Sequence, residues 1–483
     1  MKKKLVSMML VSAMAVTAFA ACGDSAKQGG DSQKPADSAA TGDSATSESE
    51  HKNEISGDAS AADAFVVWGW NDDIKKLLDG PFAADNADDH KRIVFVNTGG
   101  ADYYQTQIDA LLQTPDNEMY PDLMGLEIDY VQKYVQADGA LATMTDLGIT
   151  DEDLADQYDF NRAVCSSDGS GKAEAMKASF WQCTPGAWVL RADLCEKYLG
   201  TTDPVKLQEM FATWEKVEET AAKINDASKG KCKILSGWDD LNRVFMNNRK
   251  SGWYDSNDKI VVDDQVKAYL EEAKKFYDNN WTFNTTQWQA DWDAMKAGDG
   301  VKSEAALAYT GCPWFQYWCL PADSWKGQTI TIAGPQSFYW GGTGLAATAS
   351  CADKELAGRI IKWFTTDEKS MQKIAEFNCD FVNNKKANDA LLAESETFVT
   401  DKENDYKLAS GNGLMHSQNY MQVYIDILKN TNIDTSIVKS EDKTINDTLN
   451  DYVKKYFENG DLDATLSDLK AYIHDTFTYL SAE

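Results

Sequence analysis

The sequence predicts an α/β fold with a largely parallel sheet and additional helices towards the C-terminus. Short apolar runs of strand type cover residues 64–68, 92–96 and 121–126. Helical patterns separate these runs, so the chain alternates between strand and helix from residue 64 onwards. Such alternation is typical of a parallel sheet whose faces are covered by helices.

The helices follow from apolar residues that recur every three or four positions. Ile74, Leu77 and Leu78 mark the first helix, and a face from Tyr104 to Leu112 marks the second. Later elements are a strand over residues 328–333 and helical faces within residues 207–224, 266–277, 356–364 and 445–456.

The start of the chain predicts export. A basic segment precedes a short apolar run that ends at residue 21, and small residues stand directly before Cys22. This arrangement resembles the lipobox of bacterial prolipoproteins, although Phe19 stands where a branched aliphatic residue is usual. We therefore expect residues 1–21 to be a lipoprotein signal peptide and Cys22 to carry fatty acids such as palmitate.

A plain secretory signal, cleaved after Ala20 or Ala21, is the alternative, and it also exports the protein. Residues 22–62 then supply the lipidated cysteine and a segment poor in large apolar side chains. Such a segment cannot bury enough surface to become ordered, so the sequence predicts a disordered tether. The expected location is the outer face of the cytoplasmic membrane, with the lipid as the only membrane contact.

Composition restricts the partners. The formal net charge of −30 repels nucleic acid and favours a neutral or cationic ligand. Apart from Cys22 there are eight scattered cysteines, for which disulfides and free thiols are both open, and no Cys/His spacing suggests zinc.

The search for catalytic motifs gives no support for an enzyme. The chain has four histidines and lacks the common metalloprotease, hydrolase and P-loop signatures. Gly342-x-Gly344-x-x-Ala347 matches a dinucleotide fingerprint, but a strand-like segment follows it where a phosphate-binding helix should begin. We therefore expect no cofactor. A surface glycosidase that uses two of the many carboxylates is retained as an alternative.

Eight segments, in order, resemble the carbohydrate-binding extracellular solute-binding proteins of bacterial ABC transporters, the family 1 group related to maltodextrin-binding proteins. They cover roughly residues 64–380 and are VVWGWND at 66–72, PDLMGLEID at 121–129, GALATMTDL at 139–147, VLRADL at 189–194, TWEKV at 213–217, TGCPWF at 310–315, WGGTGLA at 340–346 and DKELA at 353–357.

The resemblance implies a periplasmic-binding-protein-like fold of type II, with two lobes, a mainly parallel sheet in each and a ligand cleft between them. The first lobe would contain residues 63–182 and 332–366, and the second residues 183–331 and 367–483. It also implies that the protein is a monomer that delivers an oligosaccharide to the transmembrane subunits of an ABC permease. A receptor of the same fold for a cationic solute, such as a polyamine or a peptide, is the other alternative.

A sugar site needs flat aromatic rings for the C–H-rich faces of the sugar and polar side chains for its hydroxyl groups. Glycine lets the backbone approach the ligand closely. These criteria and the resemblance together nominate Trp70, Asn71, Asp72, Glu127, Asp129, Trp181, Gln182, Trp238, Asp239, Trp314, Trp340, Gly341 and Gly342.

Some nominations have a purely structural alternative. Asn71 or Asp72 is equally suited to capping the helix that follows, and Trp181 and Gln182 are equally suited to packing at the first lobe crossing. Trp314 is the strongest aromatic candidate for stacking on a sugar ring.

Overall fold

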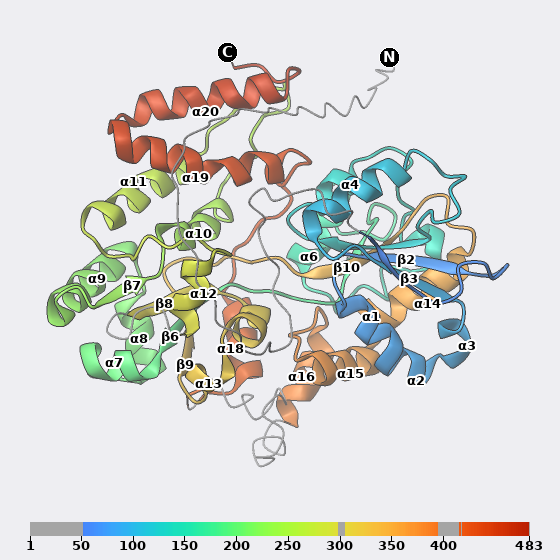
Figure 1. Ribbon diagram of the computed structural model, residues 1–483, viewed down its shortest axis with the longest axis horizontal. Helices are drawn as coiled ribbons and strands as arrows, with labels where there is room; N and C mark the ends of the chain where they lie inside the picture. The colour runs from blue at the N-terminus through green and yellow to red at the C-terminus, as the bar shows by residue number, and fades with distance from the viewer. Residues whose placement is uncertain (1–51, 298–304, 395–414, 417, 483) are drawn as a thin grey trace, which may run out of the picture. The chain divides into compact units, whose positions relative to one another are not determined.

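The computed structural model describes residues 52–297, 305–394, 415–416 and 418–482, and Figure 1 shows their arrangement. The predicted signal peptide and Cys22 lie outside these residues. Among the described residues, no helix is long and apolar enough to cross a membrane.

The first sheet has six strands in the order β1-β3-β2-β4-β10-β5. Its central strands are buried along almost their whole length, which explains why they read as continuous apolar runs. The strands are β1 (Glu54–Ser56), β2 (Phe65–Gly69), β3 (Ile93–Asn97), β4 (Leu123–Glu127), β5 (Ser179–Phe180) and β10 (Thr343–Ala347).

Strand β1 falls inside the predicted tether, so the prediction of disorder is wrong for this strand. It pairs antiparallel with β3, in the register Glu54 with Asn97. The side chain of Ile55 is 54% exposed. Pairing of the backbone, which composition does not reveal, therefore orders this strand without burial of its side chains.

The second sheet has four strands in the order β7-β8-β6-β9. These strands are β6 (Ala187–Arg191), β7 (Cys232–Leu235), β8 (Ala305–Gly311) and β9 (Thr329–Ile332). The α/β class with two sheets is confirmed, but both sheets are mixed where mainly parallel sheets were predicted. Parallel pairs join β2 to β3, β2 to β4, and β7 to β8, whereas the other neighbours are antiparallel. The strands that run against the others are β1 and β10 in the first sheet and β6 in the second. Strands β6 and β10 are the ones that the chain enters directly after it crosses from the other sheet, through residues 181–186 and 333–342.

Helices from the start and from the late middle of the chain share one hydrophobic core with the first sheet. In Figure 1 the orange helices α14 to α16 lie beside the blue N-terminal helices, and α1 contacts α15. The helices of this core are α1 (Asp73–Leu77), α4 (Ala101–Leu111), α5 (Val131–Val135), α6 (Asp159–Val164), α14 (Lys354–Thr365), α15 (Glu368–Asn378), α16 (Lys385–Ala393) and α18 (Tyr420–Lys429).

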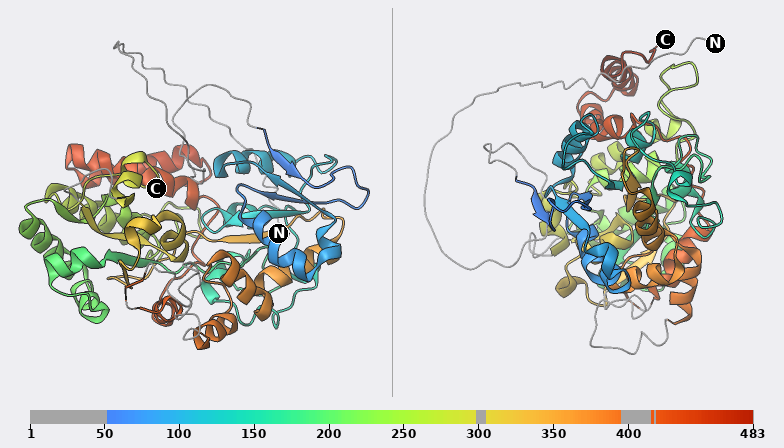
Figure 2. Two further views of the ribbon diagram at one scale, coloured as in Figure 1. Left: turned by 60° about the horizontal axis from the view of Figure 1, so that its bottom comes forward. Right: turned by 90° about the vertical axis from the view of Figure 1, so that its right-hand side faces the viewer.

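The second core surrounds β6, β7 and β8 and recruits the C-terminal helices. Figure 2 shows the red C-terminal helices against the green middle of the chain, and α11 contacts both α19 and α20. The helices of this core are α7 (Ala192–Leu199), α8 (Pro204–Met210), α9 (Trp214–Ser228), α10 (Asn242–Met246), α11 (Asp264–Asp278), α19 (Asp442–Asn459) and α20 (Leu462–Thr476).

A third, smaller core lies around Val189 and Tyr309 of the second sheet. It includes residues of α12 (Ala290–Ala297) and α13 (Ala322–Trp325). The eight cysteines within the described residues are free thiols, and most are buried, so the open question of disulfides is answered in favour of small apolar packing residues.

The prediction of a single helix within residues 207–224 is wrong. Two helices, α8 and α9, cover this range. The side chain of Thr213 accepts a hydrogen bond from the backbone N–H of Lys216 at 3.3 Å and starts α9 as its N-cap. Leu207 and Val217 are nevertheless buried in the same core, which is why the apolar spacing continues through the break.

Three segments connect the residues of the two cores, at positions 181–186, 333–342 and 430–441. Helices α15, α16 and α18 pack in the first core, although residues from 367 onwards were assigned to the second lobe. The lobe boundaries themselves stay a prediction.

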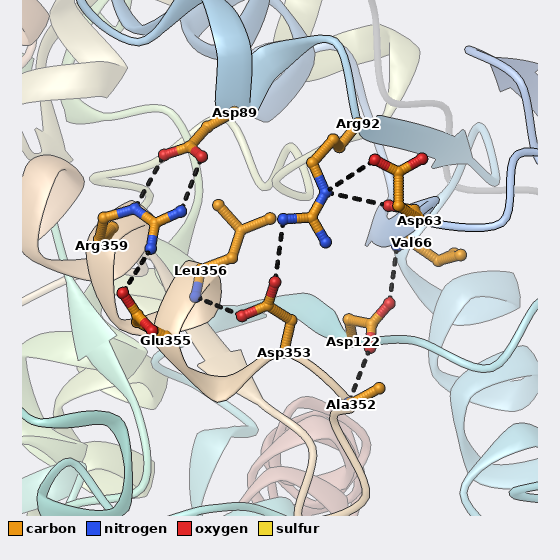
Figure 3. A network of polar contacts seen from close by, with 10 residues as sticks. All are labelled: Asp63, Val66, Asp89, Arg92, Asp122, Ala352, Asp353, Glu355, Leu356 and Arg359. Carbon is orange, nitrogen blue, oxygen red and sulfur yellow. Dashed lines mark hydrogen bonds and ion pairs between the residues drawn. The ribbon is translucent and has the colours of Figure 1, made fainter.

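A network of ion pairs ties the start of α14 to the first sheet (Figure 3). Asp353 accepts a hydrogen bond from the backbone of Leu356 at 2.9 Å, which caps α14, and pairs with Arg92 at 2.9 Å. Further along α14, Arg359 makes two hydrogen bonds to Asp89, at 2.7 and 2.9 Å.

We expect Arg359→Met to lower the free energy of unfolding by at most about 1 kcal/mol, because the Arg359 side chain is 45% exposed and exposed pairs contribute little. Asp353→Ala should cost more, about 1 to 2 kcal/mol, because it removes both a helix cap and an ion pair. Urea unfolding of the two variants measures this order, and equal losses would contradict the different roles.

Candidate functional site

A cavity of about 240 Å³ lies where loops from both sheets meet helix α19. The first sheet contributes the residues directly after β4, and the second sheet contributes the segment after β7 together with residues 286–288. The charged and aromatic side chains of its lining, with one amide, include Asp129, Asp239, Arg243, Arg249, Gln287, Trp288, Asp434, Asp442, Lys443 and Asp447.

An aromatic cluster stands beside this cavity. Trp288, which lines the cavity, has its ring stacked on Trp314, with centroids 5.9 Å apart and planes 19° apart. Trp314 meets Trp340 edge to face at 4.9 Å, and its indole N–H donates to the carbonyl of Trp340 at 3.0 Å. The predicted sugar-stacking residues Trp314 and Trp340 therefore lie together, one ring behind the cavity wall.

The ring of Trp340 is only 2% exposed, so in this structure it is not the open sugar platform that was predicted. The guanidinium carbon of Arg243 lies 5.0 Å from its ring centroid, and Phe315 stacks on it at 6.0 Å. Trp288, by contrast, is 38% exposed. The accessible aromatic surface in the cavity wall therefore belongs to Trp288.

Arg243 joins the two sheets electrostatically. Its two terminal nitrogens reach the two carboxylate oxygens of Asp129 at 3.0 and 2.7 Å. Arg243 belongs to α10 beside the second sheet, whereas Asp129 follows β4 of the first sheet. This paired geometry is the strong form of a carboxylate–guanidinium contact.

Glu127 and Gly341, both predicted, face each other. Gly341 has φ of +59°, and a Cβ atom built there would lie 2.7 Å from Oε1 of Glu127 and 3.6 Å from Nε1 of Trp314. Only glycine fits this close approach in the left-handed region. Burial and the neighbouring charge of Asp129 raise the pKa of Glu127, and Arg243 opposes that shift.

Asp239, which lines the cavity, and its neighbour Asp240 form a buried acidic pair. The backbone N–H of Gln287 donates to Asp239 at 2.8 Å, and the Gln287 side-chain amide donates to Asp240 at 2.8 Å. Asp240 also accepts from the hydroxyl of Ser236 at 2.8 Å. Burial is the largest cause that raises the pKa of each carboxyl, and for Asp239 the charge of Asp240 adds to it.

Helix α19 brings further charges to the cavity. Asp442 binds Arg249, and both side chains are buried. The next residue of the helix, Lys443, pairs with Asp447 one turn further along. Among the described residues, no group of three or more His, Cys, Asp or Glu side chains is arranged to hold a metal ion.

The residues predicted after the first strand lie elsewhere. Trp70 contacts Tyr104 edge to face at 5.4 Å. The side-chain oxygen of Asn71 accepts from the backbone N–H of Asp73 at 3.1 Å, a local bond directly before α1, whereas the N-cap position itself is Asp72, whose side chain makes no capping bond. Asp72 accepts from Asn97 at 2.9 Å and lines a separate hollow of about 590 Å³ next to β1.

Trp181 and Gln182 bind a buried carboxylate and do not line the cavity. Asp380 accepts from the Trp181 indole at 3.1 Å, from the Gln182 amide at 2.8 Å and from Asn378 at 2.8 Å. Burial raises the pKa of Asp380 to about 7. The packing alternative therefore describes both residues in this structure.

We expect Asp380→Ala to lower the free energy of unfolding by about 3 kcal/mol, because three buried donors lose their common acceptor. Asp367→Ala, which removes only a helix cap at the start of α15, is the matched control and should cost about 1 kcal/mol. Thermal or urea unfolding measures the difference, and equal losses would show that the buried donors find water instead.

The remaining predicted residues are Trp238 and Gly342. The ring of Trp238 is 6% exposed and meets Phe457 edge to face at 5.3 Å, so it packs in the second core. Gly342, at φ +113°, accepts a hydrogen bond from the backbone N–H of Ile128 at 3.2 Å. It positions the chain beside β4 without presenting a side chain.

Sequence reasoning missed Trp288, Arg243 and Gln287. Trp288 adopts φ of +67°, a conformation that side-chain residues rarely take, and that turn places its ring in the cavity wall. A tryptophan between two glutamines in a loop was the available signal. Arg243 gave none, because a basic residue in a short helix usually faces solvent.

Comparisons with known proteins identify the fold. No family profile matches the sequence, and no curated protein sequence matches it. Among solved structures, an extracellular solute-binding protein of family 1 superposes with a TM-score of 0.69 at 14% identity, over 86% of this chain and all of that one. An ABC transporter-associated binding protein from B. animalis subsp. lactis Bl-04, in complex with β-1,6-galactobiose, superposes with a TM-score of 0.62 at 16% identity, over 86% of this chain and 98% of that one.

The galacto-N-biose/lacto-N-biose I-binding protein of an ABC transporter from Bifidobacterium longum, in complex with lacto-N-biose, also has a TM-score of 0.62, at 14% identity and over 87% of this chain and 98% of that one. These proteins support the resemblance on which the site was predicted. This chain has the two-lobed α/β fold of the extracellular solute-binding proteins.

Proposed function

We propose that this protein is the extracellular receptor of an ABC importer and binds an oligosaccharide in the cavity between its two sheets. The observation that carries this proposal is the wall of that cavity, where the accessible face of Trp288 adjoins buried carboxylates and an arginine. Apolar ring and polar acceptors side by side match the two surfaces of a sugar. The solved structures of the same fold include complexes with β-1,6-galactobiose and lacto-N-biose.

Cys22 would anchor the receptor to the membrane by its lipid, and the residues before β1 would allow it to capture ligand above the surface. Ligand contacts from both sheets would shift the lobes towards a closed arrangement that the permease recognises. No chemistry on the ligand is required. Radiolabelled fatty acid should label the wild type in its native host and not Cys22→Ala, and labelling of both would remove the anchor from the proposal.

Calorimetry with a panel of oligosaccharides tests the binding function. We expect saturable binding, and Trp314→Ala should weaken it well over tenfold, because Trp314 supports Trp288 from behind and contacts Trp340. Trp281→Ala, which removes an indole that packs on Phe276, is the matched control and should leave affinity unchanged. The sugar should be recovered intact after long incubation, whereas shortened products would favour a glycosidase.

A further inference from the structure

The hydrogen bonds of Gln182 hold its side-chain amide in one orientation. The amide nitrogen donates to Oδ1 of Asp380 at 2.8 Å, and the amide oxygen accepts from the backbone N–H of Thr343 at 2.8 Å. An ionised carboxylate only accepts and a backbone N–H only donates, so the reversed amide would lose both bonds. Gln182 is 7% exposed and Asp380 2% exposed, so solvent has little access to either partner.

This amide joins the first two segments that connect the sheets, residues 181–186 and 333–342 with the residue that follows. The two segments are also bonded to each other further along. The backbone N–H of Trp340 donates to the carbonyl of Thr184 at 3.2 Å, and the Thr184 hydroxyl donates to the carbonyl of Gly341 at 2.6 Å. The carboxylate that anchors the amide therefore positions both segments together.

The second of these segments supports the cavity wall. The carbonyl of Gly342 accepts a hydrogen bond from the backbone N–H of Ile128 at 3.2 Å. Thr343 pairs with Glu127 where β10 lies against β4. Ile128 and Asp129, the next residues along the chain, line the cavity. A displacement of Thr343 would therefore displace the part of the wall that carries Asp129.

We infer that Asp380 is a positioning residue for ligand binding, which fixes the connecting segments through Gln182 and thereby places Asp129 in the cavity wall. Asp380 itself does not line the cavity. Its other oxygen, Oδ2, accepts from the Trp181 indole at 3.1 Å and from the Asn378 amide at 2.8 Å, so the carboxylate is held from both sides. The inference rests on the proposed function and adds a residue outside the cavity on which its affinity depends.

Asp380→Asn should interrupt this relay with almost no change in side-chain volume. Because Trp181 and Asn378 both donate to Oδ2, the oxygen of the new amide remains on their side. Its nitrogen then faces the nitrogen of Gln182, and two donors cannot bond to each other. Gln182 loses its anchor, and Kd for the tightest saccharide of the panel should rise at least about tenfold.

A double variant provides the matched rescue. Asp380→Asn together with Gln182→Glu exchanges the amide and the carboxylate, so the new amide donates to the new acid. The second oxygen of that acid still accepts from Thr343, and every hydrogen bond of the relay is kept. We expect Kd within about threefold of the wild type, although Gln182→Glu alone places two carboxylates together and should bind as weakly as Asp380→Asn.

The controls separate positioning from stability. Asp367→Ala removes a helix cap at the start of α15 and lowers stability, but it should leave Kd unchanged. Thermal unfolding establishes that each variant is folded at the temperature of the calorimetry. If Asp380→Asn does not fold, Gln182→Met carries the test, because it keeps the length of the side chain, loses both bonds and should raise Kd equally.

Amide hydrogen exchange tests the relay without a ligand. The backbone N–H groups of Thr343 and Ile128 should exchange at least about tenfold faster in Asp380→Asn than in the wild type, and the double variant should restore the slow exchange. Unchanged exchange overturns the inference. Equal Kd values for the wild type and Asp380→Asn also overturn it and leave the proposed function intact. A wild type that binds no saccharide overturns the proposed function, while the exchange rates still decide whether Asp380 positions the cavity wall.

Discussion

Arg243→Met is expected to lower the free energy of unfolding by about 2 kcal/mol. The substitution removes the paired hydrogen bonds to Asp129 together with the contact of the guanidinium with the Trp340 ring. Asp129 and Glu127 then face each other without their nearest cation. Breaking a fully buried pair costs about 3 to 5 kcal/mol, and the smaller value here reflects the 29% exposure of the Arg243 side chain.

Urea unfolding measures this loss of stability, and a double-mutant cycle tests whether the Arg243–Asp129 pair is responsible for it. If the pair is responsible, Asp129→Asn in the Arg243→Met background should cost less than it does in the wild type. Arg191→Met is the matched control, because Arg191 also covers an indole, that of Trp325, but pairs with Asp193 only two residues away. We expect that control to lose less than about 1 kcal/mol. Equal losses for the Arg191 and Arg243 variants would show that the Arg243–Asp129 pair between the two sheets adds nothing to the free energy of unfolding.

The pH dependence of the same site follows from Glu127. Its folded-state pKa is raised above the unfolded value, so the folded protein holds this proton at pH values where the unfolded chain has released it. Stability from this group is therefore greatest below the unfolded pKa and declines as the pH rises towards the folded pKa. Glu127→Gln should flatten that decline in urea unfolding measured across this pH interval, and an unchanged slope would assign the decline to other carboxyls.

The strands were predictable because their signal is local. All five residues of β2 are buried, so the strand appears in the sequence as an unbroken apolar run. The start of α14 was equally visible, since Asp353 is a capping residue directly before a helical pattern. Strand direction was not, because the antiparallel neighbours β10 and β4 are separated by a long excursion through the second sheet.

The site was predictable only in part, for a related reason. Glu127, Trp314 and Gly341 were nominated because each stands in a motif of its own, and the structure places them beside one another although none of them lines the cavity. Trp70 and Trp181 stand in similar motifs but pack against Tyr104 and Phe364. Which indole reaches a cavity depends on packing between distant segments, and a single sequence contains no measure of that.

Trp288→Ala is expected to cost about 2 kcal/mol of saccharide binding free energy, roughly thirtyfold in Kd. The ring is 38% exposed and lines the cavity, so its truncation removes accessible aromatic surface and opens the side of Trp314 to water. Calorimetry with the tightest saccharide of the panel measures the loss. Stability should change little, because a ring that is this exposed contributes little to the core.

Trp288→Phe tests whether affinity depends on an aromatic face at this position or on the larger area of the indole. A phenyl ring still covers the face of a sugar but loses the larger area of the indole, so we expect it to recover most of the affinity. Tyr277→Ala removes another exposed aromatic ring, which stacks on Phe457 and does not line the cavity, and should leave Kd unchanged. If Trp288→Ala binds as the wild type does, the accessible aromatic wall is not a sugar platform. The ligand would then lie elsewhere, and the hollow beside Asp72 would be the next place to test.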